Sequence, residues 1–528
     1  GCAFIRSRFS TVVLNYNCSF ILNKVGHNGG VYKHEKLQNV SNIKCTFTQN
    51  TAREMAGATY DSRVKMIFNQ YNKFAFNSAH KWQSGAVHVS NAYFLSNKNC
   101  IYMNNKLDRN DVYATGGGAV AIRKTKYISN IRCTFKENFC STYGGALHVG
   151  CVFKDKCRAG ECKNSAYSMT NFNCYFIYNR AGLSGGAVHV EYFNIIRNIG
   201  CRFLSNSAYS GCIYVYNVCK FVNMFVNVVN NSASKDGAGF YISGVKYLLI
   251  THSVFLRNTA ASHGGSVYIS TRGDFNIVRS IFSQNFARGD GGAIFIQHLT
   301  VLSNLNSTYI SNLAKGSGSV IYNGFNIFYV KNINITVINN TASKCCTIFV
   351  RGSENVQNLH SKFVKNHAKV SAGAIFIKGA IKLLFMHCAF IQNTVAQEGS
   401  GAVKADRVPT VISIDTLYYA NKCKGNGGAV ELAHVTSYFE FRGHYYHNIA
   451  RYSGGAVHYI RLEKSIQFHL CIFKYNKALL SGGAISGERS PQHFSNHSIF
   501  MYNTCGENGG TFDFTDVDSI QNQYCLFF

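Results

Sequence analysis

Proline is almost missing from this chain: Pro409 and Pro491 are the only two among 528 residues. Because proline has no backbone N–H and interrupts a β ladder, its scarcity favours a chain that is strand in almost every segment. Long hydrophobic runs are missing too, and no uninterrupted apolar run is long enough to cross a bilayer as a helix. No amino-terminal signal segment is visible. The sequence therefore gives no sign of a membrane-spanning helix.

Acidic residues are also scarce, with 24 Asp and Glu against 53 Lys and Arg, for a formal net charge of +29. Such an excess favours polyanionic neighbours, namely anionic glycans, nucleic acid or an acidic protein surface. Codon bias is the alternative explanation, because Asn, Lys, Tyr, Phe and Ile are all plentiful, as in translated AT-rich genomes. The basic residues are scattered and no nucleic-acid-binding motif is present, so nucleic acid is the least expected partner.

Glycine, by contrast, is abundant at 47 residues and recurs at a fixed interval. Residues 183–190 read Leu-Ser-Gly-Gly-Ala-Val-His-Val, and variants occur at 264–269, 291–296 and 454–458. The position after the glycine pair repeats about every 27 residues, for example at Ser266, Ala293 and Ser319. An interval this regular over half the chain indicates a solenoid.

A second motif keeps the same interval. Residues 45–52 read Cys-Thr-Phe-Thr-Gln-Asn-Thr-Ala, and the frame returns at 201–208, 253–260 and 471–478. The position two residues before the Phe holds Cys or Ser, and Asn lies three residues after it. Each interval therefore carries one glycine motif and one Phe-x-x-Asn motif, which together define one coil.

Within the glycine motif the side chains alternate as in a strand. Val188 and Val190 should face one way, and Ala187 and His189 the other. The glycine pairs and the many β-branched residues do not fit a helix. Strands that stack on the same strand of the next coil form a parallel β-helix. We therefore predict an all-β parallel β-helix of about nineteen coils, in one continuous segment over residues 1–528 with loop insertions near 106–115 and 151–168. Both ends lie inside repeats, so we expect this segment to be part of a longer protein.

Stacking also predicts the core. Val, Ile and Phe should point inward, and the glycine pair should occupy a corner that needs positive φ or close backbone approach. The Asn of the second motif suits a left-handed turn, and its amide should hydrogen-bond from coil to coil. Cys alternates with Ser or Ala at two positions, so we interpret it there as a small buried residue.

The alternation of Gly-Gly-Ala-[Ile/Leu/Val] with Phe-x-x-Asn resembles the polymorphic outer-membrane-protein (Pmp) repeat family. The resemblance runs from Gly29 to Phe527, with departures at residues 345–347, which read Cys-Cys-Thr, and at Val337, which replaces Phe. It implies a right-handed parallel β-helix displayed at a cell surface and often used in adhesion. We expect an extracellular or cell-surface location and no cofactor.

One column of side chains is a candidate binding surface. The second residue after the small one in the glycine motif should point outward, and along the coils it is mostly aromatic. Stacked exposed aromatic rings could bind a sugar, a partner chain or a neighbouring filament subunit, whereas the alternative is that they only stabilise the sheet. The column reads Tyr214, Tyr241, Tyr268, Phe295, Ile321, Phe349 and Phe376.

The same column holds His88, His148, His189 and His458. His148 and His189 should lie on adjacent coils, at a distance that permits one shared metal ion, but the sequence places no acidic or Cys partner beside them. We therefore predict no metal site. An enzyme of the β-helix polysaccharide lyase or hydrolase kind would need clustered carboxylates, and the best pair, Asp406 and Asp415, is sparse. We predict no catalytic site.

Two kinds of covalent modification are open to the chain. In an oxidising compartment, the 151–168 insertion could contain one disulfide among Cys151, Cys157 and Cys162. Asn-x-Ser/Thr sequons, which permit glycosylation without requiring it, occur at Asn17, Asn39, Asn230, Asn306, Asn334, Asn339 and Asn496.

Taken together, the motifs predict a non-enzymatic extracellular β-helix that acts as a cell-surface adhesin or structural rod. Its expected partners are glycans or acidic protein surfaces. A subunit of an extracellular filament, which would contact copies of itself or other subunits, is the first alternative. A polysaccharide-active β-helix enzyme is the second.

Overall fold

The computed structural model describes residues 3–7, 11–108, 116–150 and 167–528. All regular secondary structure in these residues is β-strand, which confirms the all-β prediction. Among the same residues no helix is long and apolar enough to span a membrane. The chain divides into two compact units, residues 1–262 with 266–273, and residues 263–265 with 274–528. Each unit is described by itself below, and the prediction of one continuous domain stays a prediction.

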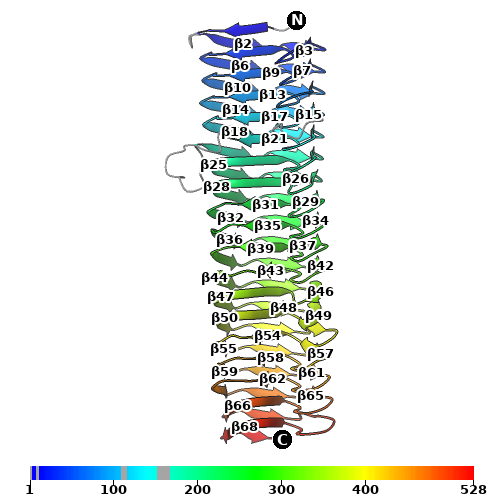
Figure 1. The fold of residues 1–528 in the computed structure, drawn as a ribbon, viewed down its shortest axis with the longest axis vertical. Helices are drawn as coiled ribbons and strands as arrows, with labels where there is room; N and C mark the ends of the chain where they lie inside the picture. The colour runs from blue at the N-terminus through cyan, green and yellow to red at the C-terminus, as the bar shows by residue number, and fades with distance from the viewer. Residues whose placement is uncertain (1–2, 8–10, 109–115, 151–166) are drawn as a thin grey trace. The chain divides into compact units, whose positions relative to one another are not determined.

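One turn of the first unit consists of four short strands. They are β31 (Phe240–Ser243), β32 (Tyr247–Thr251), β33 (Val254–Leu256) and β34 (Thr259–Ala260). Each lies parallel to the matching strand of the preceding turn, so that β31 and β32 both pair with β28 (Ile213–Met224). Figure 1 shows these strands side by side in the green part of the chain. The first unit is therefore a parallel β-solenoid.

The second unit repeats this plan. A turn there runs through β58 (Val430–Ala433), β59 (Ser437–Phe441), β60 (His444–Tyr446) and β61 (Ile449–Ala450), again with parallel neighbours. The two units together contain about 18 turns at a spacing of about 27 residues, close to the nineteen predicted. Counting motifs includes the partial turns at the two ends. The handedness of the coil stays a prediction.

Some turns join their first two strands into one. These joined strands have 12 residues each and lack the break that separates β31 from β32. They are β25 (Val188–Ile199), β28, β47 (Ile348–Leu359), β50 (Ile375–Met386), β66 (Ile485–Asn496) and β68 (Phe512–Gln523).

The Phe position forms the centre of the core. Phe255, Phe282 and Phe473 have no exposed surface, which confirms that this position points inward. The rings stack from turn to turn. The ring centroids of Phe135 and Phe176, for example, are 4.8 Å apart, and the angle between the ring planes is 3°. Val337 takes the same place, paired with Tyr309 on the preceding turn, as predicted. In-register parallel stacking thus turns the sequence interval into a continuous apolar column.

The Asn of the second motif forms an amide ladder in each unit. Asn50 Nδ2 donates to Asn77 Oδ1 on the next turn at 3.0 Å and to the carbonyl of Phe20 on the preceding turn at 2.9 Å. Each ladder Asn therefore links three turns, which confirms the predicted hydrogen bonding along the stack. The left-handed conformation belongs to another residue. Gln49, directly before Asn50, has φ 56°, because the turn places the Asn amide toward the stack.

The two glycines of the motif have different roles. Gly185 has φ 69°, in the left-handed region. Gly186 does not, but a Cβ on it would lie 2.6 Å from the carbonyl oxygen of Ser207, so it is required by close backbone approach. Both predicted reasons for the pair are therefore confirmed, one for each glycine.

The repeated cysteines are small buried residues, as predicted. Cys133 donates from Sγ to the carbonyl of Ile131 at 3.4 Å, and Ser253 donates from Oγ to the carbonyl of Thr251 at 2.8 Å, so the two types make the same bond. Cys140 packs in a core cluster with Ala79 and Leu107. Of the described cysteines, Cys219 on β28 is disulfide-bonded, which was not predicted, and the others are free thiols.

Burial should make the core thiols unreactive. It raises the pKa of Cys388 to about 11 and the pKa of Cys423 to about 12, so few thiolates exist at neutral pH. We expect iodoacetamide to alkylate both at least ~100-fold more slowly than the partly exposed Cys505. Peptide mass spectrometry of the folded protein measures the rates, and equal rates in urea serve as the control. Fast native labelling of Cys388 would contradict its burial.

The two predicted insertions lie partly outside the described residues. Lys106 and Leu107 are not in a loop: they form β16 (Lys106–Leu107), which pairs with the turns on both sides, and Leu107 is buried because it continues the Ala position. Ser168 likewise begins β22 (Ser168–Phe172). Residues 109–115 and 151–166, and with them Cys151, Cys157 and Cys162, lie outside the described residues.

Candidate functional site

The predicted aromatic column exists, and we call it the outer column. In-register pairing defines its members in each unit. In the first unit they are Phe4, Lys33, Tyr60, His88, Ala121, His148, His189, Tyr214, Tyr241 and Tyr268. In the second they are Phe295, Tyr322, Phe349, Phe376, Lys404, Glu431, His458, Ser486 and Asp513.

Most neighbouring rings of the outer column stack face to face, whereas Phe349 and Phe376 are tilted by 60°. Tyr214 and Tyr241 lie 4.9 Å apart at 6°, and Tyr241 and Tyr268 lie 4.7 Å apart at 8°. The assignment of Ile321 to this column is wrong, because Ile321 pairs with Ile294 and points into the core. Tyr322 takes the place, 5.3 Å from Phe295, so the aromatic run in the second unit is unbroken.

The outer column is less exposed than predicted. Tyr268 is 9% exposed and Phe295 is 7% exposed, and the neighbouring rings are half-buried. At two turns the residue directly before the glycine pair lies over the column. The ring of Tyr143 lies 4.8 Å from His189, and the ring of His263 lies 4.6 Å from Phe295. Whether the column binds a ligand stays a prediction.

A different aromatic stack is exposed, which we call the exposed aromatic ladder: His447, Tyr475 and Tyr502. Their ring centroids are 5.0 and 5.2 Å apart on successive turns of the second unit. Tyr475 is 43% exposed and Tyr502 is 52% exposed. Lys474 Nζ lies 5.0 Å from the ring centroid of Tyr475. Each residue precedes a ladder Asn, so comparing that position from coil to coil in the sequence would have revealed the stack.

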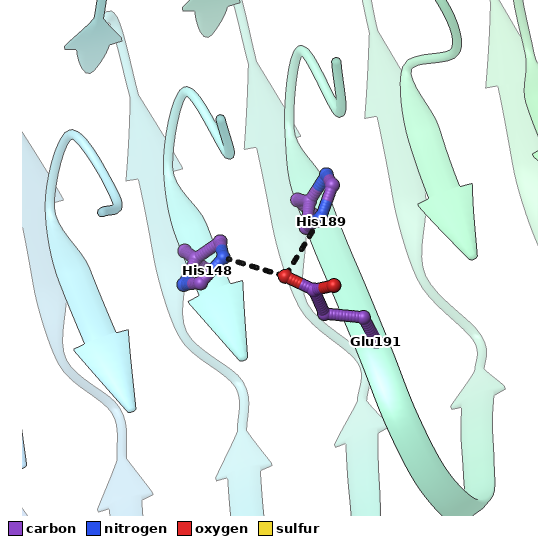
Figure 2. A group of neighbouring side chains, drawn as sticks. All are labelled: His148, His189 and Glu191. Carbon is purple, nitrogen blue, oxygen red and sulfur yellow. Dashed lines mark ion pairs between the residues drawn. The ribbon is translucent and has the colours of Figure 1, made fainter. Parts of the chain in front are cut away.

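His148 and His189 lie on adjacent turns, as predicted. They are paired in register between β21 (Leu147–Gly150) and β25, and their rings stack at 5.1 Å. The expectation that no acidic partner lies beside them is wrong. Glu191, two residues after His189 on β25, places Oε1 3.7 Å from His148 Nε2 and 3.6 Å from His189 Nε2 (Figure 2).

The electrostatics of this triad follow from its burial. Both histidine side chains are at most 5% exposed, whereas the Glu191 side chain is 26% exposed. Burial lowers the pKa of His148 to about 4, so its imidazole is neutral at pH 7. Burial raises the pKa of Glu191, but the adjacent imidazoles of His148 and His189 outweigh this effect, so that pKa is lowered overall. At neutral pH the triad therefore contains a neutral His148 imidazole and the Glu191 carboxylate.

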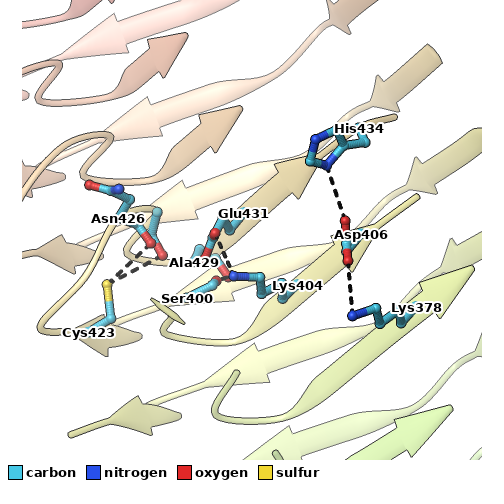
Figure 3. A network of polar contacts seen from close by, with 10 residues as sticks. Lys378, Ser400, Lys404, Asp406, Cys423, Asn426, Ala429, Glu431 and His434 are labelled. Atoms are coloured by element: carbon cyan, nitrogen blue, oxygen red, sulfur yellow. Dashed lines mark hydrogen bonds and ion pairs between the residues drawn. The ribbon is translucent and has the colours of Figure 1, made fainter. Parts of the chain in front are cut away.

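Each carboxylate of the predicted acidic pair has cationic partners of its own. Asp406 lies 3.7 Å from Lys378 Nζ and 3.3 Å from His434 Nδ1 (Figure 3). Asp415 accepts from Arg442 Nη2 at 2.7 Å, and its other carboxylate oxygen lies 2.6 Å from Arg442 Nε. Partners of this kind fix the orientation of both carboxylates. Asp406 and Asp415 therefore form ion pairs with residues of neighbouring turns.

The outer column carries a further ion pair in the second unit. Lys404 Nζ donates to Glu431 Oε1 at 2.7 Å, on the next turn (Figure 3). Glu431 itself is largely buried, which raises its pKa although Lys404 opposes the shift. Lys404 and Glu431 therefore continue the column by charge pairing where aromatic stacking ends.

The sequons lie in two settings. Whether they are glycosylated stays a prediction. Asn39 starts β6 (Asn39–Ile43) and Asn496 ends β66, and both side chains are half-buried. The others have exposed side chains and positive φ: Asn17, Asn230, Asn306, Asn334 and Asn339.

Comparison with known proteins finds one repeat match. Residues 279–297 match the Chlamydia polymorphic membrane protein repeat; they include the Phe-x-x-Asn motif of Phe282 and the glycine pair before Ala293. Neither the curated proteins nor the solved structures compared with the chain include a match. The repeat is that of surface and outer-membrane proteins. The repeat match and the parallel β-solenoid together support a Pmp-like β-helix repeat protein.

Proposed function

We propose that this chain is the solenoid part of a cell-surface adhesin and that it binds an acidic glycan over the exposed aromatic ladder of its second unit. The repeat match supports a surface protein. The single observation that carries the binding proposal is the stack of His447, Tyr475 and Tyr502, because exposed aromatic rings in a row are unusual on a surface without a partner.

The chemistry of the ladder suits a sugar chain. Aromatic faces offer an apolar surface for the C–H face of a pyranose ring, and a Tyr hydroxyl can still hydrogen-bond. Successive rings about 5 Å apart form a platform that runs along the turns. Lys474 beside Tyr475 and the net charge of +29 add attraction for carboxylate or sulfate groups. An acidic glycan uses both features, whereas an acidic protein surface uses mainly the charge.

A glycan array that includes uronate-containing, sulfated and neutral glycans tests this proposal. The Tyr475→Ala/Tyr502→Ala double variant should lose at least ~10-fold in affinity for acidic glycans, because truncation of aromatic anchors at an interface costs more than about 1.4 kcal/mol. Tyr178→Ala removes a single exposed tyrosine from the first unit and should leave binding unchanged. Undiminished binding by the double variant would refute the role of this ladder.

Two further measurements separate the other possibilities. If Tyr241→Ala/Tyr268→Ala alone abolished binding, the outer column would be the site instead. Light scattering of the same sample distinguishes an adhesin from a filament subunit, because the latter should assemble through its surfaces in solution. A monomer that binds acidic glycans is the expected result.

A further inference from the structure

We propose that His148, His189 and Glu191 form a zinc-binding site in the first unit. The proposal is independent of glycan binding, which we place in the second unit. Two imidazole nitrogens and one carboxylate oxygen are a ligand set that zinc accepts, with a fourth position left for water.

The ligand atoms already converge. The three ligand atoms all lie within 4.8 Å of one another, and Glu191 Oε1 is 3.7 and 3.6 Å from the two Nε2 atoms. Ligand atoms around a tetrahedral zinc ion, at bonds of about 2.0–2.1 Å, lie about 3.3 Å apart. A contraction of a few tenths of an ångström would therefore bring the nitrogen–oxygen distances to those of a bound ion.

The backbone makes room for this arrangement. His148 and His189 come from neighbouring strands in parallel register, so their rings project side by side from the same face (Figure 2). Gly150 follows Val149 on the preceding turn, and a Cβ there would be in van der Waals contact with Glu191 Cγ and His148 Cε1, each at 3.4 Å. The Glu191 side chain therefore packs against the preceding turn, beside His148.

The surrounding groups favour an ion over a simple hydrogen-bonded pair. Both ring nitrogens of His148 are buried without a hydrogen-bond partner, and such a polar group is costly to bury. His189 Nδ1 bonds Ser184 Oγ at 3.0 Å, which orients its Nε2 toward Glu191 and is the kind of outer support that metal-binding histidines have. A zinc ion would satisfy His148 Nε2 and use the free lone pairs of all three residues.

Charge and access also fit. Because the side chain of Glu191 is 26% exposed while both imidazoles are buried, an ion can enter past the carboxylate. Zinc binds imidazole nitrogens together with a carboxylate oxygen, and Glu191 is the acidic member that offsets part of the charge of the ion. Arg123 is the nearby cation whose charge acts on both His148 and Glu191, and zinc must bind against its repulsion.

The test is calorimetric titration of the chelator-treated full chain with zinc chloride. We expect saturable binding of one ion per chain through the triad, lost at least ~100-fold in affinity in Glu191→Gln and His148→Gln, because each removes a direct ligand. His458→Gln is the matched control: it removes a buried histidine from the outer column of the other unit and should leave binding unchanged. Glu191→Gln alters a partly exposed group, so it decides the outcome even if His148→Gln fails to fold.

The free cysteines make a second readout necessary. Zinc K-edge X-ray absorption should show only nitrogen and oxygen neighbours at about 2.0–2.1 Å, and cobalt(II) should bind without a thiolate charge-transfer band. Sulfur neighbours, or affinity unchanged by Glu191→Gln, would overturn the proposal. So would the absence of saturable binding in the folded wild-type chain.

Discussion

Replacing Asn138 with alanine is expected to lower the local free energy of unfolding by about 4 kcal/mol. Asn138 Nδ2 donates to Asn179 Oδ1 and to the carbonyl of Tyr102, both at 2.9 Å. Its Oδ1 accepts from the backbone N–H and Nδ2 of Asn105, at 3.1 and 3.0 Å. Alanine removes all four bonds at a site with 1% exposure. The partner groups on the preceding and the following turn then lose these bonds in a buried site.

Native-state hydrogen exchange read by mass spectrometry is the suitable measurement, because a solenoid can open locally and a single global transition is not guaranteed. Protection should fall in the turns that contain Tyr102, Asn138 and Asn179 and remain in distant turns. Lys136→Ala, on the same turn with an outward side chain, should change protection by less than about 0.5 kcal/mol. A similar small effect for Asn138→Ala would show that the amide ladder contributes little.

Lowering the pH from 7 to 5 is expected to destabilise the second unit through two buried histidines. Burial lowers the pKa of His493 to about 3 and the pKa of His458 to about 4. The unfolded chain, with a pKa near 6.5, then binds protons that the folded state excludes. The stability from each neutral histidine is complete above pH 6.5 and is lost as the pH falls toward the folded-state pKa. Each histidine therefore lowers the free energy of unfolding at pH 5 by about 2 kcal/mol.

Glu440 shifts stability in the opposite direction. It is fully buried, accepts from Ser413 Oγ at 3.0 Å and from Tyr445 Oη at 3.1 Å, and also accepts from Tyr438. Burial raises its pKa to about 7, although these hydrogen bonds oppose the shift. Since the folded state holds this proton more tightly than the unfolded chain does, its contribution is most favourable below pH 4.5 and is lost as the pH rises toward 7. Lowering the pH from 7 to 5 therefore increases the contribution of Glu440 to the free energy of unfolding by about 2 kcal/mol.

Two variants separate these contributions in hydrogen exchange or urea unfolding at pH 7 and pH 5. The free energy of unfolding of Glu440→Gln should fall by about 4 kcal/mol from pH 7 to pH 5, against about 2 kcal/mol for the wild type, because only the histidine effects remain. For His493→Leu the decrease in the free energy of unfolding between pH 7 and pH 5 should be about 2 kcal/mol smaller than for the wild type. Leucine matches the neighbouring Ile466 in volume and does not bind a proton. Identical pH profiles for all three proteins would contradict the buried ionisation states.

Much of the fold follows from the sequence because the stacking is in register. The inward position of Phe255 and the ladder role of Asn50 depend only on the interval, and a parallel sheet converts that interval directly into neighbours in space. The prediction is wrong where the interval is ambiguous. In the turn of Ser319 the predicted alignment is one residue off, and a shift of one residue reverses the face of the strand, so the prediction names Ile321 where the column holds Tyr322.

The candidate sites were harder to predict because they depend on side chains that leave their expected place. Glu191 reaches back one turn over Gly150, and neither residue alone carries a signal in the sequence. His34 and Asp61 form a buried pair at 2.7 Å on the inward face, where alternation predicts apolar residues. The covering of Tyr268 and Phe295 depends on how the preceding loops fold, which the interval does not fix.

The amide ladder has a consequence for how such a chain can change in length. Asn77 donates hydrogen bonds to the next turn and to the preceding turn, and Asn50 donates the same two bonds one turn earlier. Within either unit, duplication or deletion of one whole repeat would restore every donor and acceptor at the new junction, whereas an insertion of a few residues inside a strand would not. The length of this protein should therefore change by gain or loss of gene segments that encode complete repeats, and variants should differ by multiples of one repeat.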